Sequence, residues 1–458
     1  MSHWTEQAVF YHIYPLGMLG APQSNDQISL PVDRLSELCD WIPHLVDLGA
    51  NAIYLGPVFE SLTHGYDTID YNMVDRRLGT NDSLAAFVLA CHASGIRVIL
   101  DAVLNHVGRE FPPFVDVLRH GEASPYRSWF HGLEFGTPNG HGDPFSYEGW
   151  NGHTSLVKLN LREKSVREFL FNSVENWIRR FRIDGLRLDA ADCLDPQFMR
   201  ELRTLSRNVA GSVSIDGFWL MGEVVHGDYR NWANPATLDA VTNYEAYKSL
   251  YSSHNDRNYF EMSWTLNRQF GAEGLYRDIG MYNFVDNHDV SRVASVLDDA
   301  AHLYPLHILL FTMPGIPSIY YGSEWGIEGR KEPHSDALLR PRLTRESAPS
   351  KATQPDLMHA LRRLAGIRAA HPALQKGRYR ELHVTHEQLS FMRSIEGEHA
   401  IVAVNSSSGS STCTLRSDAI PDVDFVDALS PAEKFRAHNG TLEMGRIDPN
   451  WGKILVTV

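Results

Sequence analysis

The sequence predicts an α/β protein: a (β/α)₈ TIM barrel that carries an insertion subdomain after its third strand and a C-terminal antiparallel β-sandwich domain. Three observations support this prediction. Short apolar runs alternate with amphipathic helical stretches over most of the 458 residues, as repeated βα units require. The connection that follows the third apolar run is much longer than a barrel needs. After Pro372 the helical pattern gives way to alternating strands with turns.

Eight segments qualify as barrel strands, because each is nearly continuous in apolar residues and parallel strands are covered on both faces. Eight such strands favour a closed barrel over an open sheet. The segments are residues 8–14, 50–57, 96–103, 183–190, 218–225, 238–244, 281–289 and 316–322.

Helices are predicted between these strands. Apolar residues recur at helical spacing over 35–49 and 165–181, and Gly49 is a plausible stop for the first of these helices. The last barrel helix is predicted over 355–370.

These elements divide the chain into three parts. The barrel takes residues 1–104 and 150–371, the insertion takes 105–149, and the C-terminal β-domain takes 372–458. The insertion is rich in glycine, proline and aromatic residues, and long loops of this kind in a compact domain are usually functional.

The composition excludes several classes of partner. The formal net charge is −14, so most of the surface would repel nucleic acid or an anionic membrane. The N-terminus does not resemble a signal peptide, and no later stretch of about 18 apolar residues could span a membrane. Cys39, Cys91, Cys193 and Cys413 match no metal or disulfide spacing. We therefore expect a cytoplasmic protein with buried thiols.

Polar side chains stand at the C-terminal ends of four predicted strands, and this is the rim at which barrels of this type build active sites. Three carboxylates from separate strands, those of Asp189, Glu223 and Asp289, are expected to converge there. The full set is Asp101 with Asn105 and His106, Arg187 with Asp189, Glu223, and His288 with Asp289.

Such a set suits the cleavage of a glycoside with retention, which needs a nucleophilic carboxylate and a proton donor roughly 5–5.5 Å apart. Arg187, two residues earlier on the same strand face, is expected to keep Asp189 ionised. Glu223 is expected to hold a proton because of burial and neighbouring carboxylates. Taken singly, each acid is equally well explained as a helix cap, and Arg187–Asp189 as a buried ion pair.

The motifs resemble the signature regions of the α-amylase family, glycoside hydrolase family 13. The resemblance covers essentially the whole chain, including the C-terminal domain. The matching segments are DAVLNH (101–106), GLRLDAADC (185–193), GEVVH (222–226) and FVDNHD (284–289), together with HGYDTIDY (64–71) and MPGIPSIYYGSEWG (313–326).

The resemblance implies a role for each matching residue. Asp189 would be the nucleophile, Glu223 the acid and base, and Asp289 the residue that stabilises the transition state. Tyr66 would stack on the sugar bound there. The substrate-binding residues implied are Tyr66, Asp67, His106, Arg187, His226, His288 and Arg292.

The aromatic rings of the insertion could also contact sugars, since flat apolar sugar faces stack well on them. For any one ring, a place in the core of the insertion is the favoured alternative. These rings belong to Tyr126, Trp129, Phe130, Phe135, Phe145, Tyr147 and Trp150.

Three departures bear on the substrate. Asp192 and Cys193 stand where many α-amylases carry Lys-His, which puts the usual grip on a long starch chain in doubt. Lys158 in LVKLN (156–160) and the EVVH segment (223–226) resemble the cyclomaltodextrinase and neopullulanase branch, close to cyclic maltosyl-maltose hydrolase. That branch usually has an extra N-terminal domain, for which a first strand near residue 8 leaves no room. We expect a hydrolase that cleaves α-1,4-glucosidic bonds in short or cyclic maltodextrins.

No cofactor or essential metal is expected. The resemblance leaves open a structural calcium ion near Asn105, with Asp143 or Glu148 as ligands. The predicted partner is an oligosaccharide substrate, and a homodimer is an open alternative to a monomer. Two other functions also stay open: a transglycosylase or trehalose-forming isomerase of the same family, and a non-catalytic scaffold barrel.

Overall fold

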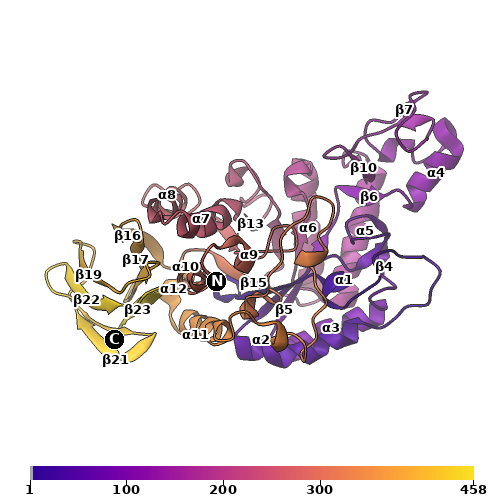
Figure 1. The fold of residues 1–458 in the computed structure, drawn as a ribbon. Helices are drawn as coiled ribbons and strands as arrows, with labels where there is room; N and C mark the ends of the chain where they lie inside the picture. The colour runs from indigo at the N-terminus through magenta and orange to yellow at the C-terminus, as the bar shows by residue number, and fades with distance from the viewer. Residues whose placement is uncertain (1–3) are drawn as a thin grey trace.

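The computed structural model of the chain describes residues 4–458 and contains a closed barrel of eight parallel strands (Figure 1). The strand order is β1-β15-β14-β13-β12-β11-β5-β2, and the pairing of β1 with β2 closes the ring. All eight predicted strands lie in it, which confirms the predicted fold. The strands are β1 (Phe10–Ile13), β2 (Ala52–Leu55), β5 (Arg97–Ala102), β11 (Gly185–Leu188), β12 (Trp219–Gly222), β13 (Ala240–Thr242), β14 (Gly280–Asn283) and β15 (Ile316–Tyr320).

Helices surround the barrel. The predicted helix over 35–49 is divided into a 3₁₀ helix, η2 (Leu35–Trp41), and α2 (Ile42–Leu48). Pro43 causes the division, because its nitrogen cannot donate to the preceding turn. The other helices outside the insertion are α1 (Pro15–Met18), α3 (Asn81–Ala93), α5 (Lys164–Phe181), α6 (Pro196–Ser212), α7 (Tyr244–Asn255), α8 (Tyr259–Phe270), α9 (Val293–Val296), α10 (Leu303–Thr312), α11 (Leu357–Ala370) and α12 (Pro372–Lys376).

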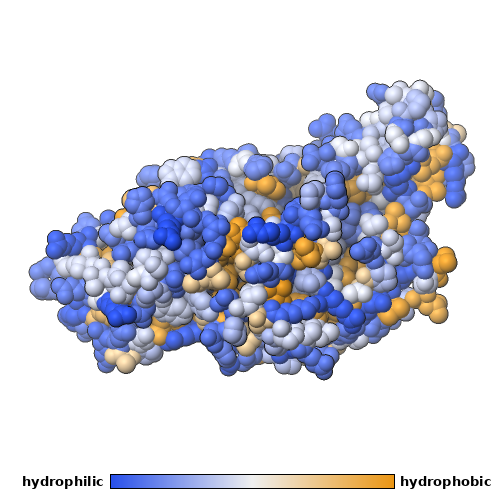
Figure 2. Space-filling view, viewed as in Figure 1, coloured by the Kyte–Doolittle hydropathy of each residue, from blue (hydrophilic) through white to orange (hydrophobic). Residues whose placement is uncertain are grey.

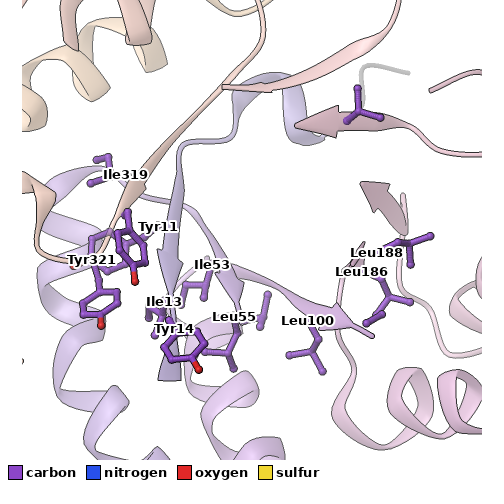
Figure 3. Close-up of a cluster of buried hydrophobic side chains, with 14 of the residues drawn as sticks. Tyr11, Ile13, Tyr14, Ile53, Leu55, Leu100, Leu186, Leu188, Ile319 and Tyr321 are labelled. Carbon is purple, nitrogen blue, oxygen red and sulfur yellow. The ribbon is translucent and has the colours of Figure 1, made fainter. Parts of the chain in front are cut away.

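Alternate residues of each barrel strand face the helices and form the main core. Tyr11 and Ile13 of β1 lie in register with Ile53 and Leu55 of β2, and all four are buried (Figure 3). Leu55 in turn lies beside Leu100 of β5. This layer fixes which side of every strand points away from the barrel axis.

The remaining residues of each strand face the barrel interior. Phe10 and Trp219 stack there with their ring centroids 5.4 Å apart, and Tyr282 meets Phe10 edge to face. Closer to the C-terminal ends of the strands, Arg187 of β11 pairs in register with Asp101 of β5. The polar side chains of the interior are therefore brought to the rim at which a site was predicted.

The insertion projects from one end of the molecule (Figure 1). Its core is aromatic, as expected for most of its rings: Phe114 meets Phe130 and Tyr147 edge to face at 5.0 and 4.9 Å. The boundary predicted at residue 149 falls inside a three-stranded sheet of order β6-β10-β9, because the strands after 149 pair within the insertion. The elements are β6 (His106–Gly108), α4 (Pro112–His120), β7 (Glu134–Phe135), β8 (Phe145–Ser146), β9 (Gly149–Trp150) and β10 (His153–Lys158).

A hairpin of β3 (Phe59–Ser61) and β4 (Thr68–Val74) follows the second barrel strand. The C-terminal domain consists of a six-stranded antiparallel sheet, a two-stranded sheet and a separate apolar core. Its strands are β16 (Arg378–Val384), β17 (Gln388–Ile395), β18 (Glu398–Asn405), β19 (Ser411–Arg416), β20 (Asp424–Asp427), β21 (Ser430–Arg436), β22 (Thr441–Ile447) and β23 (Trp451–Thr457).

The hydrophilic surface agrees with the sequence-based predictions, whereas the exposure of the cysteines agrees with them only in part. Hydrophilic residues cover most of the face shown in Figure 2, and none of the helices within residues 4–458 is long and apolar enough to cross a bilayer. The four cysteines are unpaired. Cys193 is exposed, so the expectation of a buried thiol is wrong there, because the turn that follows β11 carries this residue to the rim.

Candidate active site

The centre of the site is the buried guanidinium of Arg187. Its Nη1 donates to Asp101 at 2.8 Å and to Asp189 at 2.9 Å, and its Nη2 lies 2.9 Å from Glu223 Oε1. Arg187 and Asp189 share one face of the chain, and Glu223 directly follows the neighbouring strand β12. The structure thus brings two of the three predicted catalytic carboxylates to adjacent nitrogens of one planar group.

Asp101 connects the Arg187 guanidinium to the second strand of the barrel, β2. Its Oδ2 accepts hydrogen bonds from the hydroxyls of Tyr54 at 2.7 Å and Tyr66 at 2.9 Å. Arg187 donates to both carboxylate oxygens, so this buried group has four hydrogen bonds from three side chains. Asp101 therefore orients Arg187 and the ring of Tyr66 and is not itself open to a ligand.

The third carboxylate, Asp289, lies on the other side of the site with its own partners. Its Oδ2 is 3.0 Å from His288 Nε2, and its Oδ1 accepts from Arg340 at 3.1 Å. The hydroxyl of Tyr66 hydrogen-bonds to His288 Nε2, and the two rings stack at 5.4 Å. Because that hydroxyl also donates to Asp101, Tyr66 links the two halves of the site.

The two carboxylates on Arg187 bind protons more tightly than ordinary acids. Burial raises the pKa of Asp189 against the opposing effect of Arg187, and the Glu223, Asp101 and Asp289 carboxylates raise it further. Burial also raises the pKa of Glu223, again opposed by Arg187 and reinforced by Asp289. One positive charge is shared among several negative ones, so Arg187 does not by itself keep Asp189 ionised. The pair retains a proton at a pH where two separate carboxyls would both be ionised.

Asp289 behaves in the opposite way. Burial acts to raise its pKa, but His288 and Arg340 outweigh burial and bring the pKa well below its ordinary value. Asp289 is therefore a fixed negative charge over the whole working range of pH.

Glu223 has two further contacts that orient its carboxyl. The backbone N–H of Ala190 donates to its Oε2 at 3.2 Å, and the hydroxyl of Tyr244 lies 3.4 Å from its Oε1. Ala190 adopts the left-handed backbone region, with φ 44°, which is uncommon for a residue that carries a Cβ. This conformation occurs directly after Asp189, and it directs the backbone N–H of Ala190 towards the Glu223 carboxyl.

The predicted substrate-binding residues do not all reach the site. His106 does: it is buried with its Nε2 3.8 Å from Asp189 Oδ2, and burial, aided by His64, lowers its pKa to about 3, so that it stays neutral. His226 lies exposed beyond β12 and has no hydrogen bond or ion pair with the other described residues. Asp67 accepts from the backbone and hydroxyl of Thr63, so it shapes the turn that carries Tyr66.

For Arg292 the structure contradicts the predicted role. Its side chain is fully buried and donates to the backbone carbonyls of Tyr321 and Leu339 at 3.0 Å each. It also packs over the rings of Tyr320 and Tyr321. Arg292 lies only three residues after Asp289, but its side chain turns away from the site and anchors the segment that leads to Arg340.

Sequence reasoning missed several residues of the site. The His12 ring stacks on Tyr54 with the centroids 4.1 Å apart and meets the His288 ring edge to face. The Tyr14 ring also contacts His288, on which it stacks with the centroids 5.6 Å apart. The alternation of FYHIYP along β1 could have placed His12 in the barrel interior. Arg340 had no such signal, because it lies in an irregular segment after β15.

The residues near Asn105 lack the free carboxylates that a calcium ion would need. The Oδ1 of Asn105 is buried without a hydrogen-bond partner among the described residues. However, Asp143 forms a two-bond ion pair with Arg109, and Glu148 lies 3.4 Å from Lys158. Over residues 4–458, no group of three or more His, Cys, Asp or Glu side chains has the arrangement of a metal site. The residues present do not fit the calcium site that the sequence left open.

Comparisons with known proteins show the family of the chain. The sequence family described as "Alpha amylase, catalytic domain" matches residues 33–363. The chain is 33% identical over 421 residues to a cyclomaltodextrinase from a Bacillus species, covering 88% of this chain and 73% of that protein. Among solved structures, the ligand-free cyclic α-maltosyl-(1→6)-maltose hydrolase from Arthrobacter globiformis has a TM-score of 0.81 at 28% identity, covering 99% of both chains. The debranching enzyme from Nostoc punctiforme has a TM-score of 0.82 at 28% identity, covering 100% of both chains.

The chain belongs to the α-amylase family and is an enzyme of the glycoside hydrolase class. The resemblance predicted from the motifs is confirmed.

The opposite pKa shifts predict opposite effects of neutralising Asp189 and Asp289 on stability. The raised pKa of Asp189 favours folding below the unfolded-state pKa of about 3.9, and that contribution is lost as the pH rises through the folded-state pKa. Asp189→Asn should therefore raise Tm at pH 7, with a gain that fades towards pH 4. The lowered pKa of Asp289 contributes stability above about pH 3.9 that is lost as the pH falls, so Asp289→Asn should lower Tm at pH 7.

The measurement is a series of thermal unfolding scans of both variants and the unsubstituted protein between pH 4 and pH 8. Each variant is the control for the other, because both lose one carboxylate from the same site. A shift of Tm in the same direction for both would contradict the assigned pKa directions.

Proposed function

We propose that this enzyme is a retaining hydrolase that cleaves α-1,4-glucosidic bonds in short or cyclic maltodextrins through a covalent glycosyl-enzyme. The single observation that carries the proposal is the sharing of Arg187 by Asp189 and Glu223. Two carboxyl groups held by adjacent nitrogens of one guanidinium suit the short separation of a nucleophile and a proton donor in a retaining enzyme.

In the first step, Glu223 donates its proton to the glycosidic oxygen while Asp189 attacks the anomeric carbon. The bond to the leaving sugar breaks, and an ester between Asp189 and the glycosyl group forms. The proton that the buried pair retains supplies the acid. When Asp189 becomes an ester, the site holds one negative charge fewer beside Glu223. Glu223, now ionised more easily, is the base for the second step.

In the second step, water takes the place of the departed sugar. Glu223 accepts a proton from the water as its oxygen attacks the anomeric carbon, and Asp189 leaves as a carboxylate. Asp289 is held ionised by His288 and Arg340, and it can accept hydrogen bonds from sugar hydroxyls as positive charge develops on the ring. The neutral imidazole of His106 can contact a hydroxyl without adding charge beside Asp189.

The substrate part of the proposal rests on the relatives and on two positions of the chain. Two of the similar proteins are named for cyclic substrates, a cyclomaltodextrin and cyclic α-maltosyl-(1→6)-maltose. Asp192 and Cys193 supply neither the lysine nor the histidine with which many α-amylases grip a long chain. Short or cyclic glucans need fewer contacts beyond the scissile bond than starch does.

Variants of the two carboxylates test the chemistry. Asp189→Asn should lower kcat on maltotriose by on the order of 10⁴-fold or more, because the nucleophile is lost. Glu223→Gln should lower it by about 10²- to 10⁴-fold. With α-maltosyl fluoride, Glu223→Gln should still release fluoride rapidly in the first turnover, because this leaving group needs little help from an acid.

The measurement is stopped-flow fluoride release together with steady-state sugar release. Asp189→Asn is the control, because it should abolish the rapid fluoride release as well. Equal losses on maltotriose and on the fluoride for Glu223→Gln would remove its assignment as the acid.

A substrate panel tests the proposed specificity. Starch, pullulan, cyclodextrins, cyclic maltosyl-maltose and maltotriose should be compared by kcat/KM, with the products resolved by size. We expect the small linear or cyclic glucans to exceed starch. Preference for starch would contradict the substrate class, and trehalose or longer oligosaccharides as the main products would favour an isomerase or a transglycosylase. Inactivity on all of them, unchanged by Asp189→Asn, would favour a scaffold.

A further inference from the structure

A cavity of about 450 Å³ lies at the end of the barrel opposite the catalytic rim. Its wall includes Trp219, Gly280 and Ile316, which are the first residues of β12, β14 and β15. Gly377 and Arg378, at the start of the C-terminal domain, also line it. The catalytic carboxylates follow the C-terminal ends of the barrel strands, so the cavity is separate from the active site and lies between the barrel and the C-terminal domain.

Arg393 of β17 brings a buried guanidinium to the wall of this cavity. Its Nε donates to the carbonyl oxygen of Gly377 at 2.9 Å, and its Nη1 donates to that of Thr312 at 2.6 Å. Its Nη2 has no hydrogen bond with any other described residue, and no carboxylate within residues 4–458 forms an ion pair with the group. The guanidinium therefore has a free donor and no counter-charge.

A second buried guanidinium, that of Arg368 on α11, lies next to the same wall. Its Nη2 donates to the carbonyl oxygen of Gly315 at 2.7 Å, and Gly315 lines the cavity. All its hydrogen bonds go to backbone carbonyls, and it has no ion pair with the other described residues. Burial lowers the pKa of Arg393 well below its ordinary value, and the charge of Arg368 lowers it further. Two neighbouring buried cations without a counter-charge cost free energy, which a bound anion would offset.

Basic side chains outnumber acidic ones around the cavity, although the whole chain has a formal net charge of −14. Asp278 is shared by Arg277 and Arg378 in exposed ion pairs. Lys376 lines the cavity with an exposed side chain that has no ion pair with the other described residues. The basic side chains of the wall, of its ion-pair partners and of the adjoining α11 are Arg203, Arg207, Arg277, Arg368, Lys376, Arg378 and Arg393, and the acidic ones are Glu6, Asp239 and Asp278. A local excess of positive charge on an acidic protein favours an anionic ligand at this place.

The size and the donors of the cavity suit a phosphate group on a small molecule. Sites for small molecules have volumes of roughly 300–1,000 Å³, a range that includes this cavity. Guanidinium N–H groups match the geometry of phosphate oxygens, and their charge-assisted hydrogen bonds are stronger than those to a neutral sugar. Trp219 and Phe270 add aromatic side chains to the wall, against which the rest of such a molecule can pack.

We infer that this cavity binds a phosphate group, with Arg393 as its buried anchor and Lys376 and Arg378 as exposed cations beside it. The ligand is a small phosphorylated sugar or the free phosphate ion. Arg393 and Lys376 belong to the C-terminal domain, whereas Gly280 and Ile316 belong to the barrel, so the bound anion stabilises the junction of the two. The inference goes beyond the proposed function, since it requires no contact with the catalytic carboxylates.

Isothermal titration calorimetry and thermal unfolding in a phosphate-free buffer of low ionic strength test the site. Glucose 6-phosphate and inorganic phosphate should each bind the enzyme with a Kd of about 1 mM or lower. At saturation each should raise Tm by a few degrees, because the ligand binds only the folded state. Glucose, the control without a phosphate, should give no comparable rise in Tm. A lower Kd for glucose 6-phosphate identifies the ligand as a phosphorylated sugar, whereas equal values identify the free ion.

Three variants locate the binding. Arg393→Met keeps an apolar side chain but removes its charge, and it should raise the Kd for glucose 6-phosphate by about 10-fold or more. Lys376→Glu reverses an exposed charge at the cavity and should raise this Kd by about 3- to 10-fold. Lys434→Glu, the matched control, reverses an exposed lysine of β21 outside the wall, and its Kd should stay within about 2-fold. Lys376→Glu should hydrolyse maltotriose like the unsubstituted enzyme, since the cavity is separate from the active site.

Failure of both phosphates to bind and to raise Tm would overturn the inference. Equal weakening by Lys376→Glu and Lys434→Glu would overturn it as well, because the overall charge and not the cavity would then control binding. If Arg393→Met does not fold, Lys376→Glu decides, and an unchanged Kd for glucose 6-phosphate in that variant would contradict the site. The binding measurements involve no hydrolysis of a glucan, so the failure of the proposed function is distinguishable from the failure of this inference.

Discussion

The site depends on one guanidinium that is buried among more carboxylates than it can neutralise. Arg187 bonds to Asp101, Asp189 and Glu223 at once, and the geometry of its planar fork sets the places of the other groups. A buried cluster of this kind is a poor way to stabilise a fold. Its value lies in the excess of negative charge, which makes the pair of Asp189 and Glu223 retain a proton.

The barrel makes this arrangement possible through strand register. Arg187 lies directly beside Asp101 on the next strand, and both face the interior because Leu186 and Leu188 face the helices. A shift by one residue would exchange these two sets of side chains and destroy core and site together. The second half of the site is joined by Tyr66, which touches both Asp101 and His288. The ionised Asp289 and the proton-sharing pair are thereby kept in one site with different chemical roles.

The sequence predicts the features that follow a repeating pattern, namely the barrel strands and the acidic residues at their C-terminal ends. The eight strands could be recognised because parallel barrel strands are apolar on both faces, and Asp189, Glu223 and Asp289 could be recognised because they end such strands. The place of Arg292 could not be predicted: it follows Asp289 by three residues, but its buried side chain bonds to the backbone carbonyls of Tyr321 and Leu339. Arg340 could not be found, since its approach to Asp289 depends on the path of an irregular segment.

The most direct test of the account is the stereochemistry of the first product. Proton NMR of a maltodextrin digest, recorded within the first minutes at high enzyme concentration, distinguishes the α- and β-anomers of the newly formed reducing end before mutarotation mixes them. Asp189 attacks one face of the anomeric carbon, and water then displaces it from the opposite face, so the account predicts that the α-anomer appears first. Initial appearance of the β-anomer would show a single displacement by water, and would contradict the role assigned to the carboxylates that share Arg187.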